Sequence, residues 1–429
     1  MAAKYRLETM AIHTGQDRNE AQLSRGVPVY RTSSYLFKST EHAANLFSLK
    51  ELGNIYTRLT NPTQSILEER VAAMEGGKAA LALASGTSAI FYSIINLAKT
   101  GDEIVAANNL YGGTYTMFND ILPQFGIHVR MVKVNDFGAL SQAINEKTRA
   151  IFIETIGNPI LEVSDIDEYA RIAHENNVPL IVDSTFTTPF LLRPIEHGAD
   201  IVVHSLTKWL GGHGSGIGGV VVDSGNFDWK APKFDLFNEP DPSYHGLRYA
   251  HDLGELNSIA FAVRMRLVPL RNLGAAISPD NAWMFLQGIE TLHLRMPCHS
   301  ENALKTAEFL NQHKKVEWVK YPGLKDGNEN SHIAEKNLVK GFGGMVVFGI
   351  EGGKKAAEKF INSLKLFSHV ANVGEAKSLA IHPASTTHSQ LDEKMLQAGG
   401  IYPELIRLSI GIEHIDDIIA DISQALQQT

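Results

Sequence analysis

The first candidate for chemistry in this sequence is a lysine that follows a short apolar run. Residues 199–219 are ADIVVHSLTKWLGGHGSGIGG, so Lys208 stands between hydroxyl residues and a group of glycines. A lysine just beyond a buried strand is partly removed from water, which lowers its pKa and leaves some of it neutral. A neutral amine can form an imine with a carbonyl compound. Because most loop lysines are simply solvated, this assignment needs support from other residues.

A carboxylate stands one strand–helix–strand unit before this lysine. In PLIVDSTF, residues 179–186, four apolar residues, the first of them a proline, lead to Asp183, which lies 25 residues ahead of Lys208. Pyridoxal phosphate (PLP), an aldehyde cofactor, needs a carboxylate against its pyridinium nitrogen so that the ring stays protonated. An aspartate at a strand end can also cap the next helix. The pairing with Lys208 favours the cofactor interpretation.

Two further segments follow predicted strands and could hold a phosphate and a ring. Ser85-Gly86-Thr87-Ser88 opens a predicted helix, whose free N–H groups and hydroxyls can bind phosphate. Tyr111, followed by Gly112 and Gly113, can lie flat on a cofactor ring. Taken alone, the first segment could be an ordinary helix cap and the second a surface turn.

Two other patterns do not carry a function. Gly214, Gly216 and Gly219 match GxGxxG, but they follow the lysine loop and precede an apolar strand instead of a helix. The dinucleotide-binding interpretation therefore fails in this context. The 17 histidines include no HExxH motif and no spaced His/Cys cluster, so the sequence predicts no metal site.

From residue 61 onward, short apolar runs alternate with helical stretches that would position these side chains. A helix that begins at Asn61-Pro62-Thr63 ends before Gly76-Gly77. The alternation predicts an α/β fold, a mostly parallel sheet with helices on both faces, and ligands beyond the carboxyl ends of the strands. The predicted strands are residues 80–84, 103–107, 129–134, 150–154, 180–183, 201–203 and 219–222, and the predicted helices between them are 88–98, 114–125, 139–145 and 165–176.

The chain is predicted to have three parts. Residues 1–60 are irregular and are expected to form an N-terminal arm that lies on another subunit. Residues 61–275 would form the cofactor domain, with a turn-rich stretch at 225–280, and residues 276–429 a smaller C-terminal α/β domain. Within that domain the pattern predicts a long helix at 281–313, strands at 316–321, 344–350 and 406–410, a helix at 354–364 and a final helix.

Bulk composition excludes several classes of protein. The net charge is −8, with 39 basic and 47 acidic residues, which argues against nucleic acid as a partner. Cys298 is the only cysteine, which excludes internal disulfides and fits a reducing cytoplasm. The uncharged stretch at 79–98 is long enough to span a bilayer, but its polar residues predict a strand, a turn and a helix instead. Since no signal-peptide core is present at the N-terminus, we expect a cytoplasmic protein without a membrane partner.

Together these motifs resemble the Cys/Met-metabolism family of PLP enzymes, which have the aspartate-aminotransferase type fold (fold type I). The resemblance covers nearly the whole chain, and the SxTK motif that ends at Lys208 is specific. It implies that Lys208 carries PLP as a Schiff base and acts as the general base, and that Asp183 pairs with the pyridine nitrogen. It also implies that Tyr111 stacks on the ring.

The same resemblance implies roles for residues elsewhere in the chain. The further cofactor residues are Ser85, Gly86, Thr87, Ser205 and Thr207 around the phosphate, Thr185 beside the ring, Asn158 near the phenolic oxygen and the substrate, and Tyr56 and Arg58 reaching the phosphate of a neighbouring subunit. Arg407, in IRLSIGIE, would bind the substrate α-carboxylate, with Ser378 beside it. Without the motif, a structural ion pair of Arg407 with Glu404 or Glu413 would be preferred.

Three features are similar to one branch of the family, the O-acetylhomoserine sulfhydrylases. They are the extended region 238–273 that begins with NEPDPSYH, the motif ETIGNP at 154–159, and HPASTTH at 382–388. Gly113 stands where methionine γ-lyases carry a cysteine, which disfavours a degradative lyase. The branch implies replacement of acetate in O-acetylhomoserine by sulfide or methanethiol, which yields homocysteine or methionine for methionine biosynthesis.

The expected partners are a small amino-acid substrate and further copies of the chain, in a homotetramer built as a dimer of dimers with shared active sites. Related alternatives are cystathionine γ-synthesis, and a sulfhydrylase that uses O-succinylhomoserine or a sulfur-carrier protein. A non-catalytic or nicotinamide-binding α/β protein is the alternative from a different class.

Overall fold

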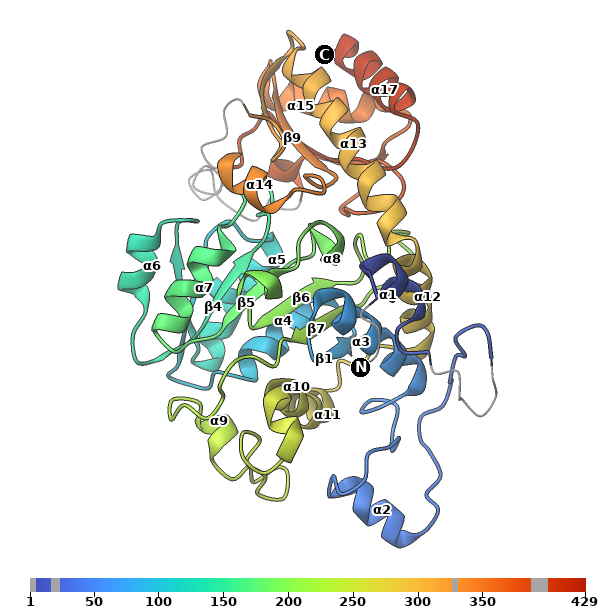
Figure 1. Cartoon of the computed structure of the whole chain (residues 1–429). Helices are drawn as coiled ribbons and strands as arrows, with labels where there is room; N and C mark the ends of the chain where they lie inside the picture. The colour runs from blue at the N-terminus through green and yellow to red at the C-terminus, as the bar shows by residue number, and fades with distance from the viewer. Residues whose placement is uncertain (1–4, 17–23, 326–330, 387–399) are drawn as a thin grey trace.

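The larger of two sheets organises the first part of the chain. The structure is a computed structural model that describes residues 5–16, 24–325, 331–386 and 400–429. Seven strands have the order β1-β7-β6-β5-β4-β2-β3 (Figure 1). β7 is antiparallel to β1 and β6, and the other neighbours are parallel. The strands are β1 (Ala79–Leu83), β2 (Glu103–Ala107), β3 (His128–Val132), β4 (Thr148–Glu154), β5 (Leu180–Asp183), β6 (Ile201–Ser205) and β7 (Gly219–Asp223).

Side chains of these strands alternate between two hydrophobic cores, one on each face of the sheet. On β6, Val202 packs into one core, whereas Ile201 and Val203 pack into the other. Because both faces are buried, the strands are continuous apolar runs, and all seven predicted strands are present within two residues at each end. The covering helices include α3 (Pro62–Glu75), α6 (Phe137–Ala143), α7 (Ile166–Glu175) and α12 (Pro279–Glu290) on the first face, and α4 (Gly86–Ile95) and α10 (Ala260–Met265) on the second.

Local signals fix where α3 and α4 begin. The Asn61 side chain accepts a hydrogen bond from Thr63 N, with a proline in the first turn. Ser85 Oγ accepts from Ser88 N at 3.0 Å, which starts α4 directly after β1. Because β7 is antiparallel to both β1 and β6, β1 and β6 run in the same direction. The N-terminus of α4 therefore lies at the sheet edge where β4, β5 and β6 end.

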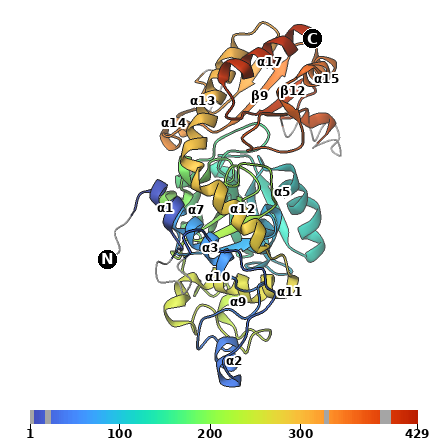
Figure 2. The same cartoon turned by 90° about the vertical axis from the view of Figure 1, so that its right-hand side faces the viewer.

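A second sheet forms most of the C-terminal part. Its five strands have the order β10-β11-β12-β9-β8, and only β10 and β11 are parallel. These strands are β8 (Val316–Lys320), β9 (Met345–Ile350), β10 (Ser368–His369), β11 (Leu379–Ile381) and β12 (Leu405–Ser409). The accompanying helices are α13 (Leu292–Asn311), α14 (Ser331–Asn337), α15 (Gly353–Ser363) and α17 (Ile415–Gln428). Figures 1 and 2 show this sheet at one end of the molecule and α2 (Thr40–Phe47) at the other.

Some predicted elements were wrong in detail. The long helix predicted at 281–313 is two helices, α12 and α13, that break at Thr291. Residues 225–280 contain more helix than expected, because α10 continues into a helical run that ends at Leu273. The arm includes α1 (Leu7–His13) and α2, although its sequence has little periodicity. The domain limits 1–60, 61–275 and 276–429 remain predictions.

The other short elements connect the strands. They are α5 (Gly112–Thr116), η1 (Met117–Ile121), η2 (Leu122–Phe125), α8 (Thr188–Leu191), η3 (Pro194–His197), α9 (Asp235–Asn238), η4 (Gly254–Ile259), η5 (Arg266–Leu270), α11 (Arg271–Leu273) and η6 (Pro383–Ser385). Residues 79–98 form β1 and α4, as the sequence predicted. Among the described helices, none is both long enough and apolar enough to cross a membrane.

Candidate active site

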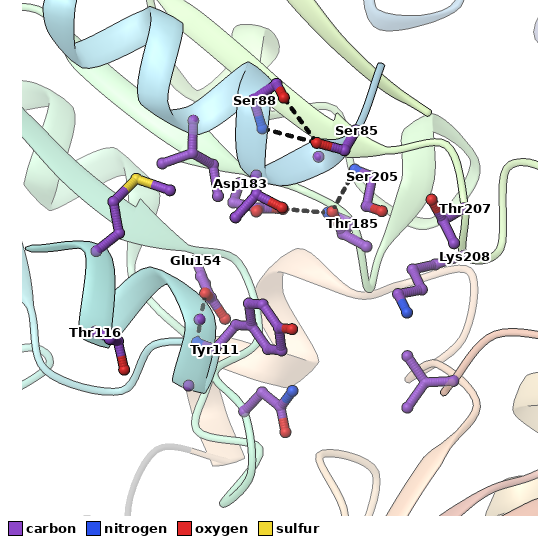
Figure 3. A pocket seen from close by; sticks show the side chains of 18 of the residues that line it. Ser85, Ser88, Tyr111, Thr116, Glu154, Asp183, Thr185, Ser205, Thr207 and Lys208 are labelled. Atoms are coloured by element: carbon purple, nitrogen blue, oxygen red, sulfur yellow. Dashed lines mark hydrogen bonds between the residues drawn. The ribbon is translucent and has the colours of Figure 1, made fainter. Parts of the chain in front are cut away.

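A cavity of about 890 Å³ lies beyond the carboxyl ends of the central strands (Figure 3). Its walls come from the residues after β1, β2, β4, β5 and β6, from α4 and the helical run that starts at α5, and from the C-terminal part of the chain. The predicted site residues that line it are Ser85, Gly86, Thr87, Tyr111, Asn158, Asp183, Thr185, Ser205, Thr207, Lys208 and Arg407. The structure thus brings together 11 of the 14 residues singled out from the sequence.

Lys208 lies three residues after the end of β6 and points into the cavity. Burial lowers the pKa of its amine to about 8; the positive charge of Arg407 acts in the same direction, and Glu375 opposes both. The amine donates a hydrogen bond to Asn372 Oδ1. Asn372 Nδ2 in turn donates to Glu375 Oε1 at 2.5 Å. A substantial fraction of this amine is therefore neutral near pH 8, as imine formation requires.

Asp183 ends β5 and faces the same cavity. Its Oδ1 accepts a hydrogen bond from Thr185 N at 2.9 Å. Burial raises the pKa of the Asp183 carboxyl, and the Thr185 hydrogen bonds oppose the rise. A positively charged ring nitrogen placed against this carboxylate would lower its pKa again. Thr185 also accepts a hydrogen bond from Ser205 N through its Oγ1, at 2.9 Å, which ties β5 to β6 at the cavity wall.

The N-terminus of α4 and the turn after β6 form a polar corner of the cavity. Gly86 packs so closely on Ser205 that an added Cβ would lie 2.7 Å from the Ser205 Cβ. The first N–H groups of α4, at Gly86 and Thr87, have no acceptor within the helix. Thr207 Oγ1 accepts a hydrogen bond from Gly218 N at 3.1 Å, which holds the lysine loop to β7. Free N–H groups and hydroxyls at a helix N-terminus are suited to a phosphate.

Tyr111 precedes α5 and extends its ring into the cavity (Figure 3). Half of the residue is exposed (50%). Its ring lies against Gly113, where an added Cβ would approach Tyr111 Cε1 to 2.6 Å. A side chain at position 113 would therefore displace the ring. The ring is placed to offer a flat face to a bound cofactor.

Arg407 on β12 reaches the cavity from the second sheet. It is 5% exposed, and its Nη1 donates to Asn158 Oδ1 at 3.0 Å. Burial lowers the pKa of its guanidinium to about 10, so the group stays charged at neutral pH. Within the described residues Arg407 forms no ion pair with Glu404 or Glu413. The alternative that Arg407 serves only in a structural ion pair is therefore not supported. A buried cation with free donors is suited to a carboxylate ligand.

The structure does not bring three predicted residues to this cavity. Ser378 is buried, and its hydroxyl donates to Glu413 Oε2 and accepts from Gly411 N, both at 2.9 Å. Its predicted place beside the substrate stays a prediction. Tyr56 and Arg58 lie on the arm, outside the walls of this chain's own cavity. The last two residues of the HPASTTH motif, Thr387 and His388, lie outside the described residues.

Two polar residues of the cavity wall that hydrogen-bond to predicted site residues, Glu154 and Asn372, were not themselves predicted as site residues. Glu154 ends β4, and its Oε1 accepts a hydrogen bond from Tyr111 N at 2.7 Å. The signal that identified Asp183, a carboxylate at the end of an apolar run, was also present at Glu154. Asn372 lies in the loop between β10 and β11 and contacts Lys208. No sequence pattern in this loop indicates that contact.

These residues fit PLP on chemical grounds. The cavity offers an amine for an aldehyde, a carboxylate for a pyridinium nitrogen, and N–H groups with hydroxyls for a phosphate. The close approach of Gly86 to Ser205 leaves no room for a side chain at position 86, so the backbone N–H of this residue stays open to a phosphate. Fold and site together define a PLP-dependent enzyme with an α/β fold and a smaller C-terminal domain.

The chain belongs to the Cys/Met metabolism PLP-dependent enzymes, since residues 8–427 match that family. It is 52% identical to the O-acetyl-L-homoserine sulfhydrylase of Leptospira meyeri, over 100% of this chain and 98% of that protein. It is 50% identical to O-acetyl-L-homoserine sulfhydrylase 1 of Thermus thermophilus, over 98% of this chain and 100% of that protein. The homocysteine/cysteine synthase of Saccharomyces cerevisiae is 45% identical, with 98% and 97% covered.

Solved structures agree with this assignment. The crystal structure of an O-acetylhomoserine (thiol)-lyase from Campylobacter jejuni has a TM-score of 0.95 and 42% identity, and covers 99% of this chain and 100% of that one. That protein contains a pyridoxyl-lysine monophosphate residue. The structure of metB from Corynebacterium glutamicum has a TM-score of 0.84 and 33% identity, with 99% and 98% covered. The predicted fold class and cofactor are confirmed; the roles of individual residues remain predictions.

Proposed function

We propose that this enzyme is an O-acetyl-L-homoserine sulfhydrylase. The net reaction replaces the Cγ–O bond of the ester by a Cγ–S bond with sulfide, and it releases acetate and L-homocysteine. The observation that carries the proposal is the similarity over full length to several enzymes named for this reaction. Methanethiol in place of sulfide would give methionine by the same replacement.

The cavity residues provide for each part of PLP. Lys208 would hold the aldehyde carbon, Asp183 the ring nitrogen, and Tyr111 one face of the ring. The phosphate would lie at Gly86, Thr87, Ser205 and Thr207, with Ser85 capping α4 beside it and Thr185 next to the ring. When bound, PLP withdraws electrons from the Cα of the substrate, which makes its proton removable.

The protein's own side chains would then orient the substrate and move its protons. Arg407 would bind the α-carboxylate, with Asn158 fixing the guanidinium. The Lys208 amine, held near Cα, would remove the proton at Cα as a general base and return a proton when the product forms. With a pKa of about 8, the amine can both accept and donate a proton near neutral pH. Asn372 would keep the amine in place while it is free of the cofactor.

The position of Gly113 supports a synthetic enzyme over a γ-lyase. Any side chain there would push the Tyr111 ring out of its present place. The cavity therefore has no thiol at this point, in contrast to the methionine γ-lyases that carry a cysteine there.

For the assembly, we propose a dimer with shared active sites, paired into a tetramer. Tyr56 and Arg58 lie away from this chain's cavity, and Arg58 Nε is buried without a hydrogen-bond partner among the described residues. In the proposed dimer, Tyr56 and Arg58 would reach the phosphate in the cavity of the second copy. The single cysteine supports a reducing compartment such as the cytoplasm.

A substrate matrix tests the proposed reaction. Acetyl-, succinyl- and phosphohomoserine are each paired with sulfide, methanethiol, cysteine and a protein thiocarboxylate, and the amino-acid products are quantified by mass spectrometry. We expect the largest kcat/KM for acetylhomoserine with sulfide, and no product from the Lys208→Ala variant. A preference for cysteine would instead identify cystathionine γ-synthesis. A preference for succinylhomoserine or for the thiocarboxylate would overturn the proposed substrate or sulfur donor.

A further inference from the structure

Glu154 and Asp183 form a pair of carboxyls at the cavity wall. They are register partners at the ends of the neighbouring parallel strands β4 and β5. Phe152 and Ile181, two residues before them, pack into the same core, so both carboxyls lie on the same face of the sheet. Neither carboxyl forms an ion pair with another described residue. Two negative charges in this position would repel each other strongly.

The hydrogen bonds of the pair favour a proton on Glu154. Asp183 is stabilised as an anion by the backbone and side chain of Thr185. Glu154 is 6% exposed and accepts one hydrogen bond through its side chain, from Tyr111 N. Burial, and then the charge of Asp183, raise the pKa of the Glu154 carboxyl well above its ordinary value. When such a pair shares one proton, the carboxyl with fewer donors binds it more tightly.

The hydrogen bond from Tyr111 N connects Glu154 to a wall of the cavity. Tyr111 is the residue before α5, and its N–H has no acceptor within that helix. The helical run that begins there continues through η1 and η2, and Gly112, Gly113, Thr116 and Met117 of this run line the cavity. One carboxyl oxygen thus fastens the beginning of this run, with the Tyr111 ring, to the end of β4.

We propose that Glu154 is a positioning residue that acts as a neutral carboxylic acid. Through one oxygen it holds Tyr111 against the sheet, and by keeping its proton it leaves the negative charge of the pair on Asp183. This inference rests on the proposed function, in which Asp183 faces the ring nitrogen of PLP. The other charged or titratable groups near the pair are Tyr111, Lys208 and Arg407 around the cavity, and His204 on the neighbouring strand β6, which pairs with Glu75 and acts on Asp183 through its charge.

Replacing the carboxylic acid by an amide should have different effects on the rate of α-proton exchange at Glu154 and at Asp183. Glu154→Gln retains the acceptor and stays neutral, so the holoenzyme should keep at least about a third of its rate of α-proton exchange. Asp183→Asn, the matched control, should lose about a hundredfold or more. Exchange is measured by NMR in D₂O with L-norvaline, which has no leaving group. This readout therefore does not depend on which homoserine ester is the substrate.

A second measurement does not involve turnover. A carboxyl whose pKa is raised by folding stabilises the fold below its ordinary pKa of 4.5, and this contribution is lost as the pH rises through the folded pKa. Glu154→Gln lacks this loss. The Tm of the Glu154→Gln holoenzyme should therefore rise relative to wild type between pH 5.5 and pH 8. Glu154→Leu, which is neutral but has no acceptor, should show the same pH trend with a slower exchange rate.

The outcomes separate this inference from the proposed function. If Glu154→Gln loses exchange as severely as Asp183→Asn while it binds PLP, Glu154 acts as an anion and the inference is wrong. A Tm difference that does not change with pH would overturn it as well. If both variants behave as expected but the substrate matrix yields no homocysteine, the proposed reaction fails and the role of Glu154 stands.

Discussion

At Lys208, burial and two neighbouring charges act on one amine. Desolvation and Arg407 lower its pKa to about 8, and Glu375 opposes them through its position behind Asn372. The amide orientation of Asn372 follows from this arrangement, because a carboxylate can only accept and so faces the Nδ2 donor. The Oδ1 acceptor is thereby directed at the lysine. The loop that carries Asn372 is fixed by Gly374 N, which donates to Ser409 Oγ at 2.9 Å.

The rate at which the apoenzyme combines with PLP should depend on pH through this amine. Only the neutral amine attacks the aldehyde, so the rate should rise with pH and level off with a midpoint near 8. Glu375→Gln removes the charge that raises the pKa, so its midpoint should fall. Stopped-flow absorbance of the PLP imine measures both, with Lys377→Gln on the same loop as the control. A midpoint near 10.5, the ordinary value for lysine, would show that burial does not act on Lys208.

Arg407→Lys should weaken substrate binding without preventing cofactor binding. A lysine keeps a charge but cannot contact both carboxylate oxygens with a planar fork, and burial lowers its pKa further. We expect KM for the homoserine ester to rise about tenfold or more, with normal PLP content. Steady-state kinetics and the imine absorbance measure the two effects. An unchanged KM would show that Arg407 has a structural role and does not bind the substrate carboxylate.

Among the elements, the depth of burial decided what could be predicted. The strands of the first sheet are buried on both faces, so they are continuous apolar runs that can be recognised in the sequence. β10 and β11 are two and three residues long and were not predicted, because such short strands have no periodicity. The break between α12 and α13 was missed because Thr291 carries no helix-stop signal. Tertiary packing, and not local sequence, sets this break.

The candidate site followed the same physical rule. Asp183, Ser85, Tyr111 and Lys208 each follow a strand of the first sheet, so strand prediction located them. Asn372 comes from a loop of the second sheet, and no local pattern places that loop next to Lys208. The approach of the two sheets is a long-range feature of the fold. For that reason only the resemblance to a family could assign Arg407.

A buried arginine on α13 ties the lysine loop to α12. Arg295 donates to Trp209 O at 2.8 Å, Gly288 O at 2.7 Å and Leu210 O at 3.3 Å. Gly212 packs against its guanidinium so closely that an added Cβ would lie 2.2 Å from Nη1. Arg295 as a residue is 5% exposed, and burial lowers the pKa of its guanidinium to about 10. Two of these acceptors, Trp209 O and Leu210 O, lie in the lysine loop, and the third, Gly288 O, lies near the end of α12 and also accepts from Thr291.

Replacing this arginine should destabilise the fold and loosen the lysine loop. Arg295→Met leaves the buried carbonyl oxygens of Trp209 and Leu210 without their guanidinium donor, which should reduce the free energy of unfolding by about 2–4 kcal/mol. PLP affinity should fall together with stability. Thermal unfolding and PLP titration measure these effects. Lys305→Met, at an exposed ion pair on the same helix, is the control and should leave Tm unchanged; an equally stable Arg295→Met would contradict the assignment.

At the scale of the whole molecule, the part of the arm around α2 extends away from the body that holds the cavity, whereas α1 packs on that body (Figures 1 and 2). Leu36, Phe37, Phe47 and Leu52 of the arm are all exposed, at 99%, 41%, 39% and 72%, and an accumulation of exposed apolar side chains is typical of an interaction surface. Arg58 lies over the ring of Tyr56 at 4.9 Å, and Glu51, a possible local partner, pairs with His42 instead. These observations favour an arm that completes the active site of a second copy.

Mixing two inactive variants tests the shared site. Lys208→Ala and Arg58→Ala chains, each nearly inactive, are co-assembled, and mixed dimers are confirmed by native mass spectrometry. If Arg58 serves the partner's cavity, a mixed dimer contains one site with both defects and one intact site, so about half of the wild-type activity should return. Lys208→Ala mixed with Asp183→Asn is the control, because both defects belong to the same wall and every site keeps one. Recovery only in the first mixture supports the shared site, and no recovery in confirmed mixed dimers would refute it.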